Sequence, residues 1–233
     1  SYNGKPIEIG KTFTSLTFDI IGKFTGGPGL DFQTTEYPER MATHPFLVAM
    51  DTALTTRHVV NNIDGGRFTD RKTYHARTDA THTLWTYAMD VINDRISGRT
   101  TSTGGPESSD VLDRMLTTID KETNEKMDIE MVRNHLILFL LVGHDSTSSL
   151  LTSLMYVLSQ NPEVENKMRA EVDRVLGGDV PTMQTIKKLP YMMAVIKETL
   201  RLYPPAGVLA KNALKDTTLG PFKIKEGSRL LLV

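Results

Sequence analysis

Apolar residues recur with a helical period over most of this chain. Between residues 7 and 24 they stand at Ile9, Phe13, Leu16, Ile20 and Ile21, a spacing that predicts an amphipathic helix. The same kind of pattern predicts further helices at about residues 45–57, 68–96, 111–119, 129–160, 162–176 and 190–203. Polar stretches rich in Gly, Ser and Thr are expected to form loops at residues 61–67 and 100–109.

Start and stop signals agree with these helix boundaries. Asp110, Asp128 and Thr182 are suited to cap helix N-termini, because their side-chain oxygens accept hydrogen bonds from the first amides of a helix. Gly177-Gly178 is suited to end a helix, and Pro204-Pro205 stops the one that begins near Pro190.

The tail of the chain changes period. Residues 218–224 and 229–232 are short apolar runs that flank Glu226-Gly227, a pattern that predicts a β-hairpin. The expected fold class is therefore mainly α, with a small C-terminal β-hairpin.

The predicted helix at residues 129–160 carries a polar cluster inside an apolar sequence. The apolar run 136–142 is followed by Gly143-His144-Asp145-Ser146-Thr147-Ser148-Ser149, and apolar residues resume at Leu150. A helix that is apolar on nearly every side is buried in a core. Yet Gly costs about 1 kcal/mol relative to Ala inside a helix, and Ser or Thr hydroxyls there bond back to carbonyls and bend it.

The helical period places part of this cluster on one stripe, which consists of Leu138, Val142, Asp145, Ser146 and Ser149, with Gly143 at its border. We interpret the stripe as the wall of a ligand pocket with one polar corner. The alternative is a helix kink whose hydroxyls bond only to the backbone, and composition leaves it open.

Composition excludes several classes of function. The chain has 233 residues, enough for one large domain or two small ones, with 27 Lys and Arg against 28 Asp and Glu. This balance gives no support for nucleic-acid or anionic-membrane binding. The absence of Cys excludes disulfides and Cys-based metal sites, and the histidines outside the cluster show no metal-ligand spacing. No signal peptide opens the chain, and its longest unbroken apolar run is too short to span a bilayer.

A second candidate feature lies near residue 200. Glu198 and Arg201 stand three residues apart on a predicted helix, so they face the same side and can pair. Taken alone, such a pair is most often a solvated surface contact.

Together and in this order, these motifs resemble the cytochrome P450 family of haem-thiolate monooxygenases. Val142-Gly143-His144-Asp145-Ser146-Thr147 resembles the oxygen-activation segment of the family's long central helix, and 197–205 (Lys-Glu-Thr-Leu-Arg-Leu-Tyr-Pro-Pro) resembles its Glu-x-x-Arg helix. Supporting matches are Leu16-Thr17-Phe18-Asp19-Ile20-Ile21-Gly22, His44-Pro45-Phe46, Asn161-Pro162, Glu171-Val172 and Leu189-Pro190-Tyr191. The details are most similar to the fatty-acid-hydroxylating branch, whose haem domain is often fused to a flavin reductase.

The resemblance implies roles for the polar cluster. Gly143 would lie against the haem, where a bare backbone leaves room for dioxygen, and Val142 and Thr147 would also contact the cofactor. Asp145 and Ser146 would be the catalytic residues, which organise water and pass protons toward the oxygen.

It also implies the surroundings of the site. Glu198 and Arg201 would form a buried structural network, and the apolar substrate pocket would be lined by Leu138, Leu141, Val142, Ala206 and Val208. The implied cofactor is haem, with electrons from an NADPH-dependent flavin reductase, and the implied partners are O₂, that reductase and a small apolar substrate. The expected location is cytoplasmic, while a membrane anchor preceding Ser1 stays open.

Three departures from the family pattern limit what this chain can do. Ser146 stands where the family has Thr, and Val142 stands where it has a smaller residue. The chain has no Cys to supply the thiolate ligand of haem iron. We therefore expect residues 1–233 to be an incomplete haem-monooxygenase domain, without its N-terminal part and its Cys-containing C-terminal part. Two alternatives stay open: a truncated, non-catalytic relative that binds an apolar ligand or a partner, and an unrelated helical interaction module.

Overall fold

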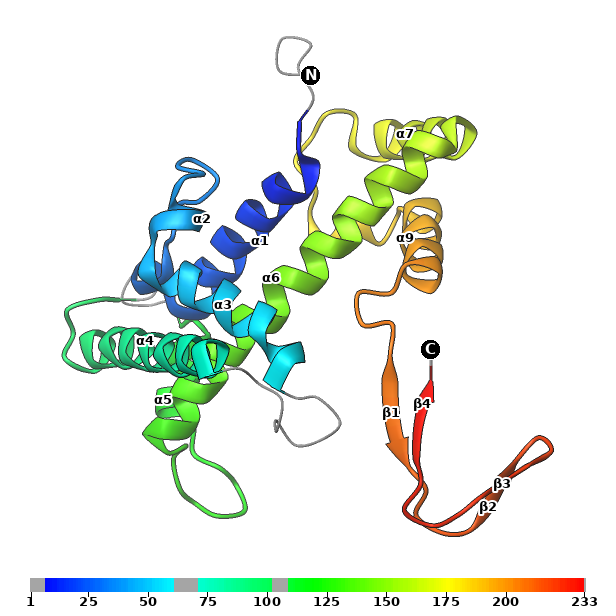
Figure 1. Cartoon of the computed structure of the whole chain (residues 1–233). Coiled ribbons are helices and arrows are strands. Elements are labelled where there is room, and N and C mark those ends of the chain that lie inside the picture. Colours follow the sequence, from blue (N-terminus) through cyan, green and yellow to red (C-terminus); the bar gives the residue numbers. More distant parts are fainter. Residues whose placement is uncertain (1–6, 61–70, 102–108, 233) are drawn as a thin grey trace. The chain divides into compact units, whose positions relative to one another are not determined.

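The computed structural model describes residues 7–60, 71–101 and 109–232. It divides the chain into two compact units, Ser1–Ser148 and Ser149–Val233. Helices predominate in both (Figure 1), which confirms the mainly α class.

The first unit consists of helices that follow one another closely. They are α1 (Ile9–Gly26), the 3-10 helix η1 (Gly27–Leu30), α2 (Arg40–Thr43), α3 (Pro45–Val60), α4 (Arg71–Ile96), α5 (Val111–Thr117) and the first part of α6 (Ile129–Gln160). The predicted long helices are confirmed, whereas η1 and α2 were not predicted, because single turns are too short to show a period. The loop predicted at residues 61–67, and most of the one predicted at 100–109, lie outside the described residues.

The buried face of α1 matches the prediction only in part, since of the predicted apolar residues Ile21 packs against the core. Leu16 and Ile20 of the predicted apolar face are 37% and 58% exposed, whereas Thr17 and Phe18 are only 4% and 2% exposed. Small residues explain the reversal, since they let the backbone of α1 approach its neighbours closely. A side-chain carbon on Gly22, for example, would collide with a backbone carbonyl of η1.

Aromatic rings form the centre of the first unit. Phe32 lies edge-on to Phe18 of α1, with ring centroids 6.1 Å apart, and stacks on Phe46 of α3 at 5.5 Å. Tyr87 of α4 contacts Phe46 at 4.9 Å, and each such pair contributes about 0.5–1.5 kcal/mol beyond its buried area. The loop that carries Phe32 thereby joins α1, α3 and α4.

A buried ion network joins the ends of three helices. Arg95 near the end of α4 has a side chain only 6% exposed, and its two terminal nitrogens each donate to Asp110 at 2.9 Å. One of them also donates to Asp113 at 2.6 Å, and the other to the carbonyl of Gly26 at 3.1 Å. Asp110 is the predicted N-cap of α5 and accepts from the Asp113 amide at 3.0 Å, which confirms that cap.

The second unit contains the rest of α6, followed by α7 (Pro162–Leu176), α8 (Met183–Ile186) and α9 (Pro190–Leu202). Gly177 closes α7 in the left-handed conformation with φ 57°, and Thr182 caps α8, as predicted. The side chain of Leu189, the N-cap residue of α9, makes no capping hydrogen bond. Instead, the Glu171 carboxylate of α7 accepts from the amides of Tyr191 and Met192 at 3.1 and 2.9 Å.

The C-terminal hairpin is confirmed, but the predicted pairing of its strands is wrong. β2 (Thr217–Leu219) pairs antiparallel with β3 (Phe222–Ile224) around Gly220-Pro221, not around Glu226-Gly227. β4 (Arg229–Leu232) pairs antiparallel with β1 (Leu209–Asn212), a strand that was not predicted. Short apolar runs identify strands but not their partners, because one turn residue more or less shifts the whole register.

Candidate functional site

The first part of α6 has two opposite faces. Its buried face repeats every four residues and consists of Val132, Leu136, Leu140, His144 and Ser148. On the other side, Leu138 and Val142 are 47% and 51% exposed, and Asp145 and Ser146 are exposed with them. The predicted stripe is therefore one surface of the helix. The expectation that α6 is buried all round is wrong for the described chain, where the stripe stays uncovered.

Helix α1 packs against α6 at Gly143 and His144, and the two helices lie beside each other in Figure 1. A side-chain carbon on Gly143 would lie 2.6 Å from Cγ1 and 2.8 Å from Cδ1 of Ile21. Ile21 of α1 therefore fills the space that a side chain at position 143 would occupy, and room for dioxygen beside Gly143 stays a prediction. Whether its backbone also contacts a cofactor stays a prediction.

His144 is held tightly against α1. Its ring stacks on Phe18 with centroids 3.8 Å apart, and the Thr17 hydroxyl donates to the His144 carbonyl oxygen at 3.1 Å. Its Nδ1 lies 2.8 Å from the Leu140 carbonyl oxygen, which can only accept, so Nδ1 carries the proton. Burial lowers the pKa of His144, although the bond to Leu140 and the charge of Asp145 oppose this, and the ring is neutral at pH 7.

Sequence reasoning placed one of these three residues of α1 on the apolar face and missed the other two. The apolar period included Ile21, which packs against the core. Thr17 and Phe18 lie between the periodic positions and were not assigned to the core, although both occur in a segment matched to the family.

The predicted catalytic residues lie on the exposed stripe. The Ser146 hydroxyl donates to the Val142 carbonyl oxygen at 2.6 Å, so its proton is held by the helix and its lone pairs are available to an outside donor. Asp145 and Ser146 are consecutive residues, which on a helix do not face each other. The neighbouring Thr147 is exposed as well. A relay between Asp145 and Ser146 would therefore need water between them.

The other predicted pocket residues fall in both units. Leu141 is partly buried on α6, whereas Ala206 and Val208 are exposed in the segment between α9 and β1 of the second unit. Their convergence on one pocket stays a prediction.

Glu198 and Arg201 form the predicted pair, with Nε to Oε2 at 2.8 Å and Nη2 to Oε1 at 2.7 Å. The hydrogen bond from Arg201 lowers the pKa of Glu198. The predicted burial is wrong for the described chain, since the side chains of Arg201 and Glu198 are 66% and 57% exposed. No described part of the chain covers that face of α9.

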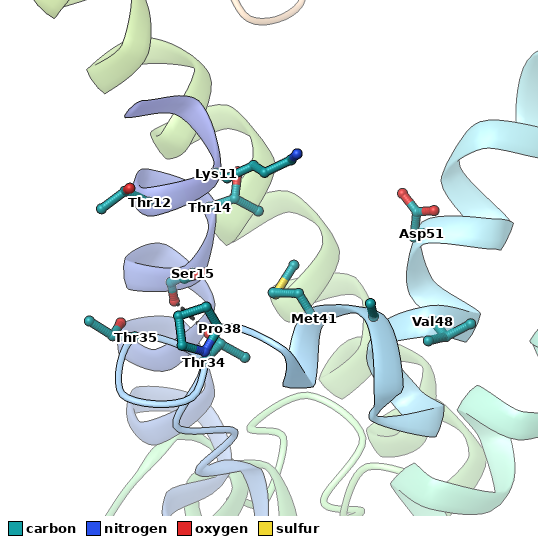
Figure 2. A pocket seen from close by; sticks show the side chains of 11 residues that line it. Lys11, Thr12, Thr14, Ser15, Thr34, Thr35, Pro38, Met41, Val48 and Asp51 are labelled. Carbon is teal, nitrogen blue, oxygen red and sulfur yellow. Dashed lines mark hydrogen bonds between the residues drawn. The ribbon is translucent and has the colours of Figure 1, made fainter. Parts of the chain in front are cut away.

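A cavity of about 690 Å³ lies elsewhere in the first unit, between α1, α2 and α3 (Figure 2). Its apolar side includes Pro38, Met41 and Val48, and Lys11 and Asp51 stand at its edges. The predicted site residues of α6 do not line it.

Comparison with known proteins identifies the family. A model of the cytochrome P450 family matches residues 2–233. This chain belongs to the cytochrome P450 family. The bifunctional cytochrome P450/NADPH–P450 reductases of Bacillus cereus and Fusarium oxysporum are 34% and 33% identical to it over 223 residues, which is 95% of this chain and 20% of each relative. A self-sufficient cytochrome P450 monooxygenase of Oidiodendron maius is 31% identical over 97% of this chain and 20% of its own length.

These relatives agree with the reductase-fused branch suggested by the motifs. The P450 chain spans about a fifth of the length of the curated relatives it matches. Among the described residues, α6 is the helix long and apolar enough to cross a membrane by those two criteria, with 22% of its most apolar stretch buried. Core helices of water-soluble proteins meet the same criteria, so this finding does not assign the protein to a membrane.

The family implies haem, and the exposed stripe fits part of a haem site. Leu138 and Val142 offer an uncovered apolar surface to a flat group, and Ser146 adds an outward-facing hydroxyl. The thiolate ligand cannot come from these 233 residues, which include no Cys. The residues of this chain could therefore form one wall of a haem pocket, but they could not supply the thiolate ligand of the iron.

Proposed function

We propose that the protein to which this chain belongs is a haem-dependent monooxygenase. It would insert one atom of O₂ into an apolar, fatty-acid-like substrate, with electrons from an NADPH-dependent flavin reductase in the cytoplasm. The exposed stripe on α6, apolar at Leu138 and Val142 and hydroxylic at Ser146, is the observation that carries this proposal. Residues 1–233 would form part of the haem domain.

The haem, when bound, supplies the oxidising chemistry. The chain itself would contribute a surface and a proton path. Leu138, Leu141 and Val142 would exclude water from one side of the pocket, and their apolar side chains suit an aliphatic substrate. Ser146 would accept a hydrogen bond from water on the stripe, and the exposed carboxylate of Asp145 would exchange protons with solvent. Gly143 and Thr147 would contribute backbone contacts.

Coupling between electron use and product formation tests this assignment. In the full-length protein, Ser146→Ala should raise the peroxide released per NADPH several-fold, because the hydroxyl that holds water on the stripe is lost. Ser159→Ala is a matched control, since Ser159 also donates to a carbonyl of α6, that of Tyr156 at 2.7 Å, and is exposed outside the motif. Unchanged coupling in Ser146→Ala would remove Ser146 from the reaction.

A second candidate is a non-catalytic relative that binds an apolar ligand or a partner, for which the exposed apolar surface of Leu138 and Val142 would suffice. The spectrum of the reduced, carbon monoxide-treated full-length protein separates the two. A band typical of thiolate-ligated haem supports the monooxygenase, and its absence supports the binding protein. We expect the 233-residue chain alone to give no such band.

A further inference from the structure

Three consecutive contacts join α1 to the polar cluster of α6. Ile21 fills the space beside Gly143, Phe18 stacks on the ring of His144, and Thr17 donates to the His144 carbonyl oxygen. All three meet the turn of α6 that carries Val142 and Ser146 on its other side. They form a clamp, by which we mean the contacts of Thr17, Phe18 and Ile21 with α6.

The Thr17 hydroxyl is the polar part of the clamp. It has one proton and three carbonyl acceptors: that of Phe13 at 2.9 Å, that of Thr14 at 3.1 Å and that of His144 at 3.1 Å. The first two lie in its own helix, where threonine hydroxyls commonly bond. The third lies on another helix 127 residues away and is buried. Because Thr17 and His144 are 4% and 3% exposed, water does not compete for this contact.

A donor from another helix affects the backbone it touches. A carbonyl that accepts a second hydrogen bond tilts away from the helix axis, and a side chain that enters the hydrogen-bond ladder bends the helix locally. In α6 the carbonyl that receives such a bond is that of His144, directly before Asp145 and Ser146. Since 3.6 residues make one turn, His144 and Ser146 lie on roughly opposite sides of α6. A hydrogen bond that holds the His144 carbonyl would therefore also fix the direction in which the Ser146 side chain points.

We propose that Thr17 is a positioning residue for Ser146. Through the His144 carbonyl it holds the turn from Val142 to Ser146 in one orientation, so that the Ser146 hydroxyl keeps a fixed place on the exposed stripe. This inference rests on the proposed function for its catalytic consequence, but its structural part can be tested without activity.

The structural test uses the 233-residue chain. Thr17→Val keeps the shape of the side chain and loses the donor, while Thr17→Ser keeps the donor. Thr14→Val is the matched control, because the Thr14 hydroxyl donates at 3.0 Å to the Gly10 carbonyl oxygen within α1 and to no described residue of α6. We expect Thr17→Val to shift the carbonyl carbon resonance of His144 and to speed amide exchange at residues 146–148 by roughly ten-fold. Thr17→Ser should restore both, and Thr14→Val should change neither.

The functional test uses the haem-loaded, full-length protein. At equal haem content, Thr17→Val should raise peroxide released per NADPH at least two-fold, and Thr17→Ser should return it to the wild-type level. A loss of stability alone would lower the amount of folded enzyme but would leave this ratio unchanged.

Each outcome has one meaning. An unshifted His144 resonance in Thr17→Val, or wild-type coupling in an active Thr17→Val enzyme, overturns the positioning role and leaves the proposed function intact. An inactive wild-type enzyme overturns the proposed function. The His144 carbonyl resonance in Thr17→Val would still decide whether Thr17 holds the His144 carbonyl. If Thr17→Val does not fold, the wild-type chain decides: a scalar coupling across the hydrogen bond from the Thr17 hydroxyl proton to the His144 carbonyl carbon supports the contact, and a coupling to the Phe13 or Thr14 carbonyl alone contradicts it.

Discussion

Gly143 provides the sharpest test of the α1–α6 junction. Replacing a helical Gly with Ala normally stabilises a protein by about 1 kcal/mol. Here the new carbon would lie 2.6 Å from Cγ1 of Ile21, too close for real contacts, so the side chain of Ile21 must move. Overpacking of this kind costs about 1–3 kcal/mol. We therefore expect Gly143→Ala to lower the free energy of unfolding by about 1 kcal/mol.

Removing the side chain of Ile21 should reverse the sign of the stability change caused by Gly143→Ala. In an Ile21→Ala background the two closest atoms are gone and only Cβ of residue 21 remains, at 3.4 Å, an ordinary contact, so Gly143→Ala should then stabilise the chain by about 1 kcal/mol. The difference between the two backgrounds is a coupling of about 1–3 kcal/mol, within the range measured for residues in contact. If only the helix propensity of alanine mattered, Gly143→Ala would stabilise the protein both with Ile21 and with Ala at position 21.

Urea unfolding followed by tryptophan fluorescence can measure these four proteins. Trp85 is the lone tryptophan of the chain and belongs to the first unit, where the Arg133 guanidinium lies 4.6 Å from the centre of its ring. Its signal therefore reports the unit that contains the junction. If Gly143→Ala stabilises the protein both with and without Ile21, the close approach is refuted.

Three further predictions concern buried or partly buried polar groups. Arg95→Met should cost about 3–5 kcal/mol, because it leaves the carboxylates of the ion network buried without their cation. Asp19→Asn should cost about 1–3 kcal/mol at pH 7, since this carboxylate accepts two backbone amides at 2.7 Å. Burial acts to raise the pKa of Asp19, but hydrogen bonds from the next loop lower it overall, so its stabilisation is present above about pH 4 and is lost as pH falls further. Burial lowers the pKa of His144, so wild-type stability should fall as pH drops below about 6.5, and His144→Phe should show a smaller fall.

Urea unfolding as a function of pH checks all three. Arg99→Ala is the control for Arg95, since that side chain is 67% exposed, and it should change stability by no more than about 0.5 kcal/mol. The gap between Asp19→Asn and wild type should narrow below about pH 4; a constant gap contradicts the carboxylate's role. For His144→Phe, an unchanged pH dependence between 5 and 7 would mean that the ring is not buried as neutral imidazole. His44, whose pKa burial also lowers, is present in both proteins and does not affect the comparison.

The helices could be predicted because their determinants are local. Asp110 and Thr182 mark N-termini through bonds to amides three residues away, and the left-handed Gly177 marks a C-terminus. Packing could not be predicted in the same way. The period of α1 assigned Leu16 to the core, whereas Thr17 and Phe18 lie against α6 in its place.

The sequence could predict which residues share one surface of α6, but not which groups enclose that surface to form a pocket. The helical period places Val142 and Ser146 on one surface, and the structure agrees. Which groups cover that surface depends on chain segments far from it in the sequence, and the period carries no information about them. The same limit explains Glu198 and Arg201, which pair as their spacing predicts but remain exposed.

The Glu171 carboxylate gives the start of α9 an unusual dependence on another helix. Most helices begin with a cap from their own chain neighbourhood, but α9 takes its first amide partners from α7, twenty residues earlier for Tyr191. Movement of α7 would thus uncap the very helix that presents the Glu198–Arg201 pair. The two helices are therefore coupled: a partner that displaces α7 would destabilise the N-terminus of α9 without contacting α9.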